Sequence, residues 1–239
     1  MQSSQETSLS APRDWPRLSA DLAEFSPRAL PVLQRMVERY PELRPCAPDL
    51  ARAFEVIARA FERGATLFVC GNGGSQADAL HIAGELDKSF RHPRPLSAEQ
   101  KKRLEGLPGG AELAAHLQRG LPTIPLGANP ALSSAIANDN PLPHIGFAQE
   151  LYALGKKGDV LLGISTSGKA QNVRYAAVTA RALEMTVISL TGPEGGPLAS
   201  QADIAIRAPG TDTPEIQGWH IQLYHCLCDM IEVHAFERD

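Results

Sequence analysis

The sequence predicts an α/β domain with a parallel central sheet. Apolar runs of strand length lie at 66–70, 159–164 and 186–190, and a turn rich in glycine or hydroxyl side chains follows each run. Segments with helical periodicity separate these runs, a pattern typical of strands that pair in parallel with helices on both faces of the sheet. The 239 residues are enough for one such domain with a large core.

Two amphipathic helices precede the first strand. Apolar residues recur at helical spacing over 27–40 and again over 48–63, where a glycine follows the second helix. Residues 1–24 are polar, contain two prolines and lack periodicity, so we expect a flexible N-terminal tail. The single folded domain is then expected to span residues 25–239.

The same patterns predict the other elements. These are helices at 75–88, 170–185 and 216–236 and strands at 121–126 and 202–207. Two prolines in the 121–126 strand favour an edge position in the sheet. Residues 97–120 have mixed charge and are expected to form an inserted segment with two short surface helices near that edge.

The composition excludes several classes of protein. The chain has 43% hydrophobic residues and a formal net charge of −4, which disfavours nonspecific nucleic-acid binding. No apolar stretch approaches the ~18 residues of a membrane helix, and the N-terminus lacks the pattern of a secretory leader, so we expect a cytoplasmic protein without membrane contact. The four cysteines form no C-x-x-C pair and are expected to be reduced and buried.

Two loops at predicted strand ends carry the residues best suited to bind an anion. Gly71-Asn-Gly-Gly-Ser75 offers glycines for close backbone approach and the N-terminus of a helix, and Ser165-Thr-Ser167 offers three hydroxyls before another helix. Helix capping accounts for one hydroxyl in each loop. Neither loop matches the nucleoside triphosphate or dinucleotide fingerprints, so the loops favour a phosphorylated small molecule.

Two helices carry residues suited to metal binding or proton transfer. His81 and Glu85 are four positions apart and share a helix face. Gln217 and His225 are eight positions apart on the last helix and lie within ~80° of one another around its axis, whereas His220 lies further round. Two imidazoles, a carboxylate and an amide oxygen form a plausible zinc site and, equally, an acid/base set.

Taken together, these motifs resemble the sugar isomerase (SIS) family, with the phosphoheptose isomerases as its most similar branch. The resemblance covers residues 28–236 apart from the 97–120 insertion. It implies a flavodoxin-like three-layer sandwich with extra N-terminal helices, assembled as a homotetramer whose active sites lie where subunits meet. It also implies an aldose–ketose isomerase that converts sedoheptulose 7-phosphate to D-glycero-D-manno-heptose 7-phosphate through an enediol, for activated heptose biosynthesis.

The resemblance also assigns roles to individual residues. It makes Glu85 and His225 the acid/base pair, which suffices to move a proton between C1 and C2 of the sugar. The residues matched to zinc ligands in some members are His81, Glu85, Gln217 and His225. The residues matched to substrate binding are Asn72, Gly73, Ser75, Asp139, Ser165, Thr166, Ser167 and Gln217.

Some features of the chain depart from the family pattern, and other functions are compatible with it. Ala170 replaces a serine that often follows the second loop, and Lys169 offers a compensating charge. A non-catalytic SIS-domain adaptor that binds a protein such as the replication initiator is the main alternative, but that branch lacks the catalytic His and Glu found here. Other sugar-phosphate enzymes of the fold, such as arabinose 5-phosphate isomerase or muramic acid phosphate etherase, are a further alternative.

Overall fold

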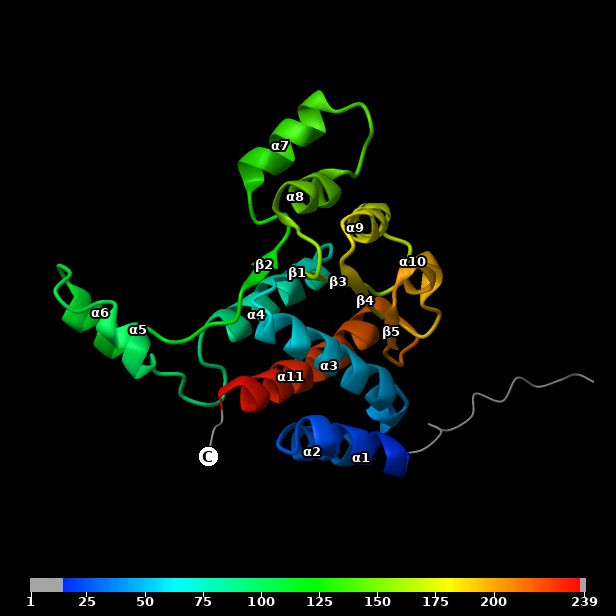
Figure 1. Cartoon of the computed structure of the whole chain (residues 1–239). Coiled ribbons are helices and arrows are strands. Elements are labelled where there is room, and N and C mark those ends of the chain that lie inside the picture. Colours follow the sequence, from blue (N-terminus) through cyan, green and yellow to red (C-terminus); the bar gives the residue numbers. More distant parts are fainter. Residues whose placement is uncertain (1–14, 237–239) are drawn as a thin grey trace, which may run out of the picture.

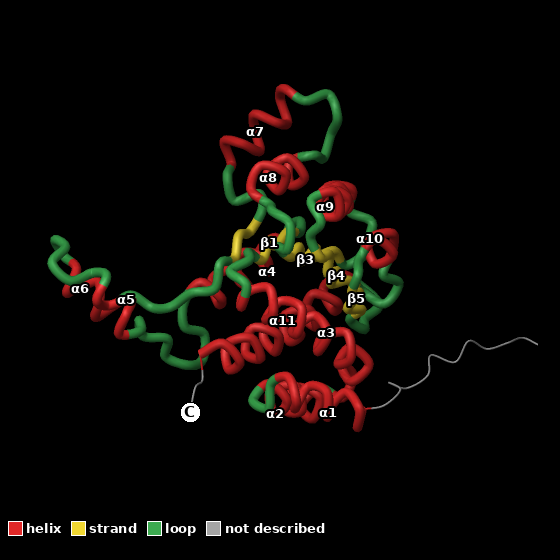
Figure 2. Tube along the Cα trace, in the orientation of Figure 1, coloured by secondary structure: helices red, strands yellow, loops and turns green. Residues whose placement is uncertain are grey.

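A five-stranded, all-parallel sheet with the order β2-β1-β3-β4-β5 lies at the centre of the molecule (Figure 1 and Figure 2). The computed structural model of the chain describes residues 15–236. The strands are β1 (Leu67–Cys70), β2 (Thr123–Pro125), β3 (Val160–Ser165), β4 (Thr186–Thr191) and β5 (Ile204–Arg207). The proline-containing strand β2 lies at an edge, as its sequence predicts.

Helices cover both faces of the sheet and confirm the predicted three-layer sandwich (Figure 1). One face carries α8 (Gly146–Leu154), α9 (Gln171–Ala182) and α10 (Gly196–Gln201), with α7 (Pro130–Asp139) packed on α8. The other face carries α3 (Ala47–Glu62), α4 (Gly74–Asp87) and α11 (Thr213–Phe236). Helices α1 (Trp15–Phe25) and α2 (Ala29–Arg39) lie outside α3 and α11, and a 3-10 turn over Pro41–Cys46 leads from α2 into α3.

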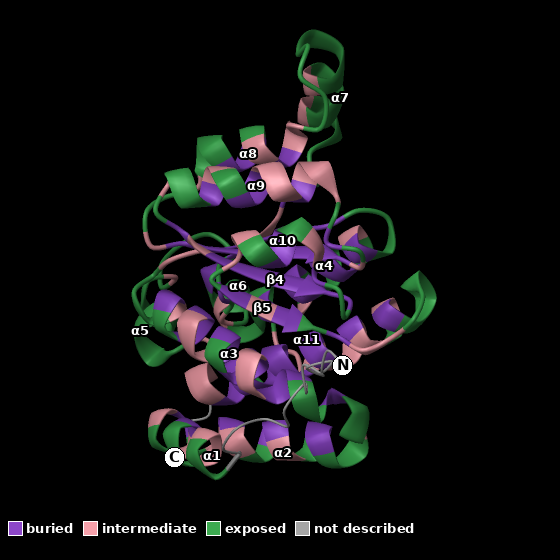
Figure 3. Cartoon of the chain, turned by 90° about the vertical axis from the view of Figure 1, so that its right-hand side faces the viewer, coloured by how far each residue is buried: buried purple, intermediate pink, exposed green. Residues whose placement is uncertain are grey.

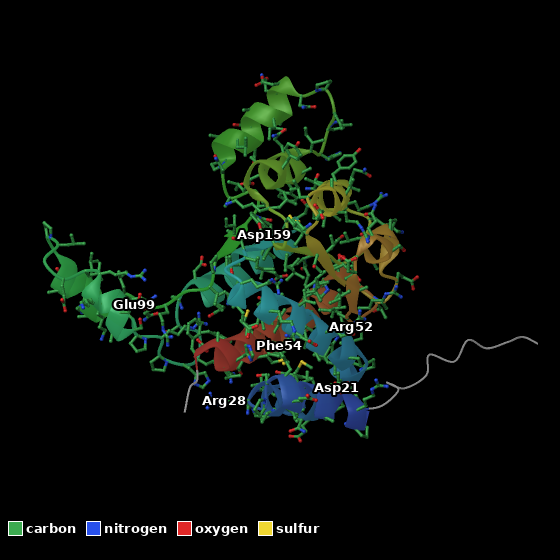
Figure 4. The ribbon with its side chains drawn as sticks, in the orientation of Figure 1. Asp21, Arg28, Arg52, Phe54, Glu99 and Asp159 are labelled. Carbon is green, nitrogen blue, oxygen red and sulfur yellow. The ribbon has the colours of Figure 1, made fainter. Side chains whose placement is uncertain are left out.

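The prediction of a tail over residues 1–24 is wrong for its last part. Helix α1 begins at Trp15, and its Leu22 is buried against the neighbouring helices. Phe25, at its end, packs edge-on against Phe54 of α3, with ring centroids 5.7 Å apart. Phe54 also contacts His234 of α11, so it joins three helices (Figure 4). The first 14 residues of the expected tail lie outside the described residues.

The core divides into two clusters, one on each side of the sheet. Every residue of β1 and β3 is buried, which explains why these strands read as continuous apolar runs (Figure 3). Asp159 joins the beginnings of the two strands: its carboxylate accepts hydrogen bonds from the backbone N–H groups of Thr66 and Lys156, both at 2.8 Å (Figure 4). No helix among residues 15–236 is long and apolar enough to cross a membrane.

The insertion forms an arm that extends away from the sheet (Figure 1). It contains α5 (Ala98–Lys102) and α6 (Gly110–His116), as the sequence predicts for two short helices. Its base is held by an antiparallel bridge between Pro95 and Gln118 and by a hydrogen bond from Arg119 N–H to the Arg94 carbonyl, 2.7 Å long. The arm is therefore fixed next to the C-terminal end of α4.

A buried ion pair fixes that end of α4 against α11. The side chains of Arg94 and Glu232 are both 0% exposed, and Arg94 Nε donates to Glu232 Oε1 at 2.6 Å. The guanidinium also donates to the carbonyls of Leu86 and Glu85, the last turn of α4. Burial alone raises the pKa of Glu232, but the N–H groups of Phe90 and Arg91 and the charge of Arg94 outweigh it, so the pKa lies below its ordinary value.

Removing one member of this pair should destabilise the fold strongly. Glu232→Gln leaves the Arg94 charge buried without its carboxylate, and we expect a loss of about 3–5 kcal/mol in the free energy of unfolding. Urea denaturation of both proteins measures this loss in the free energy of unfolding. Glu184→Gln, which breaks the exposed Lys157–Glu184 pair, is the control and should leave the midpoint unchanged. Equal midpoints for the two variants would contradict the role given to the buried pair.

Candidate functional site

The two predicted loops follow neighbouring strands whose next helices lie on opposite faces of the sheet. Strands β1 and β3 are neighbours, but β1 continues into α4 on one face and β3 continues into α9 on the other. Such a switch point leaves a crevice at the carboxyl ends of the two strands, where open α/β sheets bind their ligands. The loops 71–75 and 165–168 lie at the carboxyl ends of these two strands.

Both loops present the backbone amides of a helix N-terminus. The N-cap residues of α4 and α9 are Gly73 and Ala170, and neither accepts a hydrogen bond through its side chain. Serine capping therefore does not account for the hydroxyls in either loop. Gly71 allows the first loop to turn tightly, because a Cβ at this position would collide with the backbone of Ser75. Each helix N-terminus attracts an anion through its dipole, although the N–H groups of Ser75 and Gln76 already bond to the carbonyls of Asn72 and Gly73 at 3.0 and 3.1 Å.

The side chains of the two loops differ in burial and are held by hydrogen bonds. Ser165 is buried at the end of β3, whereas Ser167 is exposed and its hydroxyl accepts the Lys169 N–H at 3.2 Å. Asn72 and Asn172 exchange two side-chain hydrogen bonds of 2.8 and 2.7 Å, which tie the first loop to the beginning of α9. Asn172 is a site residue that sequence reasoning missed, because it lies in a helix without any motif.

Helices α4 and α11 run side by side and in the same direction away from the crevice. Near the beginning of α4, a Cβ at Gly74 would collide with the amide group of Gln217. Further along, the Tyr224 hydroxyl lies 2.9 Å from His81 Nδ1, at the same offset of 143 residues. At the far end Glu232 accepts hydrogen bonds from the loop after α4. Residues of α4 and α11 that contact one another therefore keep nearly the same sequence offset over the length of α4.

This packing brings His81, Glu85 and His225 together. His81 Nε2 lies 2.9 Å from Glu85 Oε1, and the rings of His81 and His225 meet edge-on with centroids 5.0 Å apart. Phe90 stacks on the ring of His225, with centroids 5.6 Å apart. The three candidate ligand atoms all lie within 4.8 Å of one another. The structure thus places the predicted acid/base pair in a single cluster.

The surroundings of His225 favour its neutral form. Burial lowers the pKa of His225, and the nearby His81 and Arg91 lower it further, while the Glu85 carboxylate acts in the opposite direction. A cavity of about 270 Å³ between α2 and α11 reaches His225 and is lined by Arg35, Arg39 and Arg91, among others. A neutral imidazole is the form that accepts a proton or binds a metal.

The donor set suits a divalent metal ion of the zinc type. Two imidazoles and a carboxylate within this spacing match the nitrogen and oxygen ligands of catalytic zinc sites, which leave a position open for water or substrate. A second group, formed by His92, Asp229 and Glu232, does not fit a metal, because both Glu232 oxygens already accept N–H groups and Arg91 and Arg94 lie beside it.

The other predicted residues lie outside this cluster. Gln217 lies at the N-terminal end of α4, about 12 Å along α11 from His225 at 1.5 Å per residue. Asp139 is exposed at the end of α7, where it accepts a hydrogen bond from the Asn138 side chain at 2.8 Å. Helix α7 has no buried residue and stands apart from α4 and α11 (Figure 1 and Figure 3). Their roles as ligand and substrate contact stay predictions.

His220 is separate from the cluster and lies in the core. It is fully buried under the end of β4, close to the backbone of Thr191, and neither ring nitrogen has a partner within ordinary hydrogen-bond length among the described residues. Burial lowers the pKa of His220 to about 4, and the Thr191 backbone opposes this only in part. Sequence reasoning placed it away from Gln217 and His225, as observed.

Comparison with known proteins identifies the chain as a SIS-domain protein. The SIS domain model matches residues 121–192. The chain belongs to the phosphoheptose isomerase family within this class. It is 36% identical to the phosphoheptose isomerase of Rhodospirillum rubrum over 199 residues, which cover 83% of this chain and 93% of the relative.

Solved structures agree with this assignment. The phosphoheptose isomerase of Neisseria gonorrhoeae has a TM-score of 0.62 and 30% identity, with 90% of this chain and 97% of that chain covered. The enzyme of Francisella tularensis has a TM-score of 0.64 and 29% identity, with 89% and 96% covered. These relatives support an enzyme rather than the adaptor that the motifs left open.

The buried His220 should make stability depend on pH. Its folded-state pKa lies below the unfolded value, so the unfolded chain binds a proton first as the pH falls. The resulting stability is complete above pH 6.5 and is lost toward pH 4, by about 3 kcal/mol at 1.36 kcal/mol per unit. Urea unfolding of wild type and His220→Leu across this range measures the difference. His116→Gln, at an exposed position, is the control, and parallel curves for His220→Leu and wild type would refute the prediction.

Proposed function

We propose that the chain interconverts sedoheptulose 7-phosphate and D-glycero-D-manno-heptose 7-phosphate in the cytoplasm. The observation that carries the proposal is the cluster of His81, Glu85 and His225 in line with an anion-binding crevice on the same helix pair. Membership of the phosphoheptose isomerase family supports the same substrate. Four buried, free cysteines fit the reducing conditions of the cytoplasm.

The distance between crevice and cluster suits a long sugar phosphate. Ser75 and Glu85 are ten residues apart on α4, or about 15 Å at 1.5 Å per residue, and helical side chains lean toward the N-terminus. An extended seven-carbon monophosphate spans eight bonds from C1 to phosphorus, about 10 Å at the ~1.2 Å per bond of an extended chain. The Glu85 side chain covers the remainder, whereas a three-carbon phosphate would leave a gap.

The residues of the two loops hold the phosphate end in this proposal. The amides at the beginning of α4 and α9, with Asn72, Gly73, Ser75 and the hydroxyls of residues 165–167, surround the anion. Binding at this remote end orients C1 and C2 of the sugar at the cluster, which lowers the entropic part of the barrier.

Proton transfer then takes place between Glu85 and His225. One group removes a proton from C1 of the ketose while the other protonates the carbonyl oxygen at C2, which gives the enediol. Return of a proton to C2 and loss of the proton on O1 complete the aldose. A zinc ion held by His81, Glu85 and His225 would polarise the carbonyl and stabilise the negative charge that develops. The predicted fourth ligand, Gln217, lies about 12 Å along α11 from His225 in the same chain, so the proposal does not use it as a ligand there.

Loss of either acid/base group should slow turnover strongly without unfolding the protein. For Glu85→Gln and His225→Asn we expect a fall in kcat of about 10²–10⁴-fold, the usual contribution of general acid–base catalysis. Formation of the aldose from sedoheptulose 7-phosphate, with and without a chelator, measures the rate. Glu112→Gln on the exposed arm is the matched control. Full activity of Glu85→Gln would remove Glu85 from the mechanism.

The proposal includes a homotetramer in which Asp139 of one subunit completes the site of another. Its exposed position on α7, away from the cluster of its own chain, supports this arrangement.

Mixed oligomers test this arrangement directly. Asp139→Asn and Glu85→Gln chains should each be inactive alone, and refolding them together should restore part of the activity, because some sites then receive both native residues. Refolding Glu85→Gln with His225→Asn is the control and should restore none, since both residues belong to one chain's cluster. Absence of recovery in the first mixture would show that Asp139 does not act across subunits.

A further inference from the structure

A buried tyrosine links the cluster to a carboxylate that the proposed mechanism does not use. Tyr224 is 1% exposed, and its hydroxyl lies 2.9 Å from Nδ1 of His81. The carboxylate of Asp78, one turn before His81 on α4, lies near the same hydroxyl and, after burial, contributes to raising the pKa of Tyr224. Asp78 is buried, and its Oδ2 makes no hydrogen bond of ordinary length with the described residues, so it retains the capacity to accept one.

His81 therefore has both ring nitrogens engaged. Nε2 lies 2.9 Å from Glu85 Oε1, and Nδ1 faces Tyr224. A neutral imidazole carries one proton, so one nitrogen donates and the other accepts. Without a metal ion the contact with the Glu85 carboxylate requires the proton on Nε2, and the Tyr224 hydroxyl then donates to Nδ1.

Binding of a metal ion would require the His81 proton on the other ring nitrogen. A cation at the cluster needs the lone pair of Nε2, so the imidazole proton must be on Nδ1. Tyr224 can then accept this proton's hydrogen bond, because a hydroxyl both donates and accepts, and it turns its own hydrogen toward Asp78. The imidazole and the tyrosine each keep one proton in both arrangements.

We propose that Tyr224, with Asp78 behind it, is a positioning residue that accepts the Nδ1–H hydrogen bond of His81 when a divalent cation is bound and thereby holds Nε2 toward that cation. The pair takes the place of the carboxylate or carbonyl that usually accepts the second N–H of a metal-bound histidine. The inference rests on the proposed function only in taking His81 as a ligand.

The surroundings show why a tyrosine serves here. The rings of His81 and His225 each meet Tyr224 edge-on, with centroids 5.4 and 5.0 Å away. The tyrosine ring thus also limits rotation of both imidazoles. Removing the hydroxyl alone keeps this packing, so Tyr224→Phe separates the hydrogen bond from the steric role.

Zinc affinity and histidine tautomers of the full-length protein test the inference. We expect Tyr224→Phe to bind Zn²⁺ about 10–100-fold more weakly in competition with a chromophoric chelator, the range found when outer hydrogen bonds to a metal ligand are lost. In two-bond ¹H–¹⁵N spectra, zinc-loaded wild type should show His81 protonated on Nδ1, and metal-free Tyr224→Phe should show an altered tautomer ratio. His81→Asn assigns the signals.

Controls separate this role from a structural one. Tyr152→Phe, at a position 67% exposed, should change neither quantity. Asp78→Asn should weaken zinc binding less than Tyr224→Phe and provides the test if the latter fails to fold. Unchanged affinity and tautomer in the variants would overturn the inference, as would wild type that binds no zinc. Weaker binding without a tautomer change would show packing only, which also overturns it.

Zinc affinity and the His81 tautomer can both be measured on a protein that has no catalytic activity. A protein that shows the expected tautomer and zinc behaviour but no isomerisation of the heptose phosphate would refute the proposed function and leave the role of Tyr224 standing.

Discussion

The parallel packing of α4 against α11 is the constraint on which the rest of the site depends. It places His81 and Glu85 beside Tyr224 and His225, although these residues are far apart in the sequence. At its beginning the approach is close because Gly74 has no side chain, and the amide group of Gln217 fills the space that a Cβ would take. At its end the buried Arg94–Glu232 pair prevents sliding.

The sheet also fixes the position of the site, because it fixes where α4 begins. Because α4 follows β1 directly, the beginning of the helix is fixed at the switch point between β1 and β3, and the loop proposed to bind the phosphate cannot move independently of the cluster. At the other end of α4, Arg94 contributes both to the packing of α4 on α11 and to the position of the Glu85 backbone. Its guanidinium binds the carbonyl of Glu85, so the same side chain that stabilises the packing also fixes the backbone of the proposed base.

Local patterns in the sequence were sufficient to predict the strands, most of the covering helices and the faces that carry His81, Glu85 and His225, but not the covering helices α8 and α10. Those elements have a strong period and a buried face, which is the signal that sequence reasoning detects. Helix α7 lacks this signal because it has no buried residue, whereas α1 buries Leu22 but begins in a polar segment. The family motifs, rather than spacing, brought the two distant helices together in the prediction.

The residues that sequence reasoning missed share a physical reason. Tyr224 reads as a core aromatic residue and Arg94 as a surface charge, because nothing local shows what a side chain meets across the fold. Asn172 pairs with Asn72 only because β1 and β3 are neighbours. Such contacts depend on the topology, so they become visible only once the strand order is known.

Contacts within the single chain stabilise helix α7 only in part. A ten-residue helix is too short to be stable through backbone hydrogen bonds alone, and it is usually stabilised by burying an apolar face. In α7, Asn129 caps the N-terminus and α8 packs alongside, yet Leu132 and Ile136 are only half-buried and no residue is fully covered. The face that carries these residues therefore gains most from a contact outside its own subunit, and the proposed tetramer, with Asp139 at the end of the same helix, would provide one.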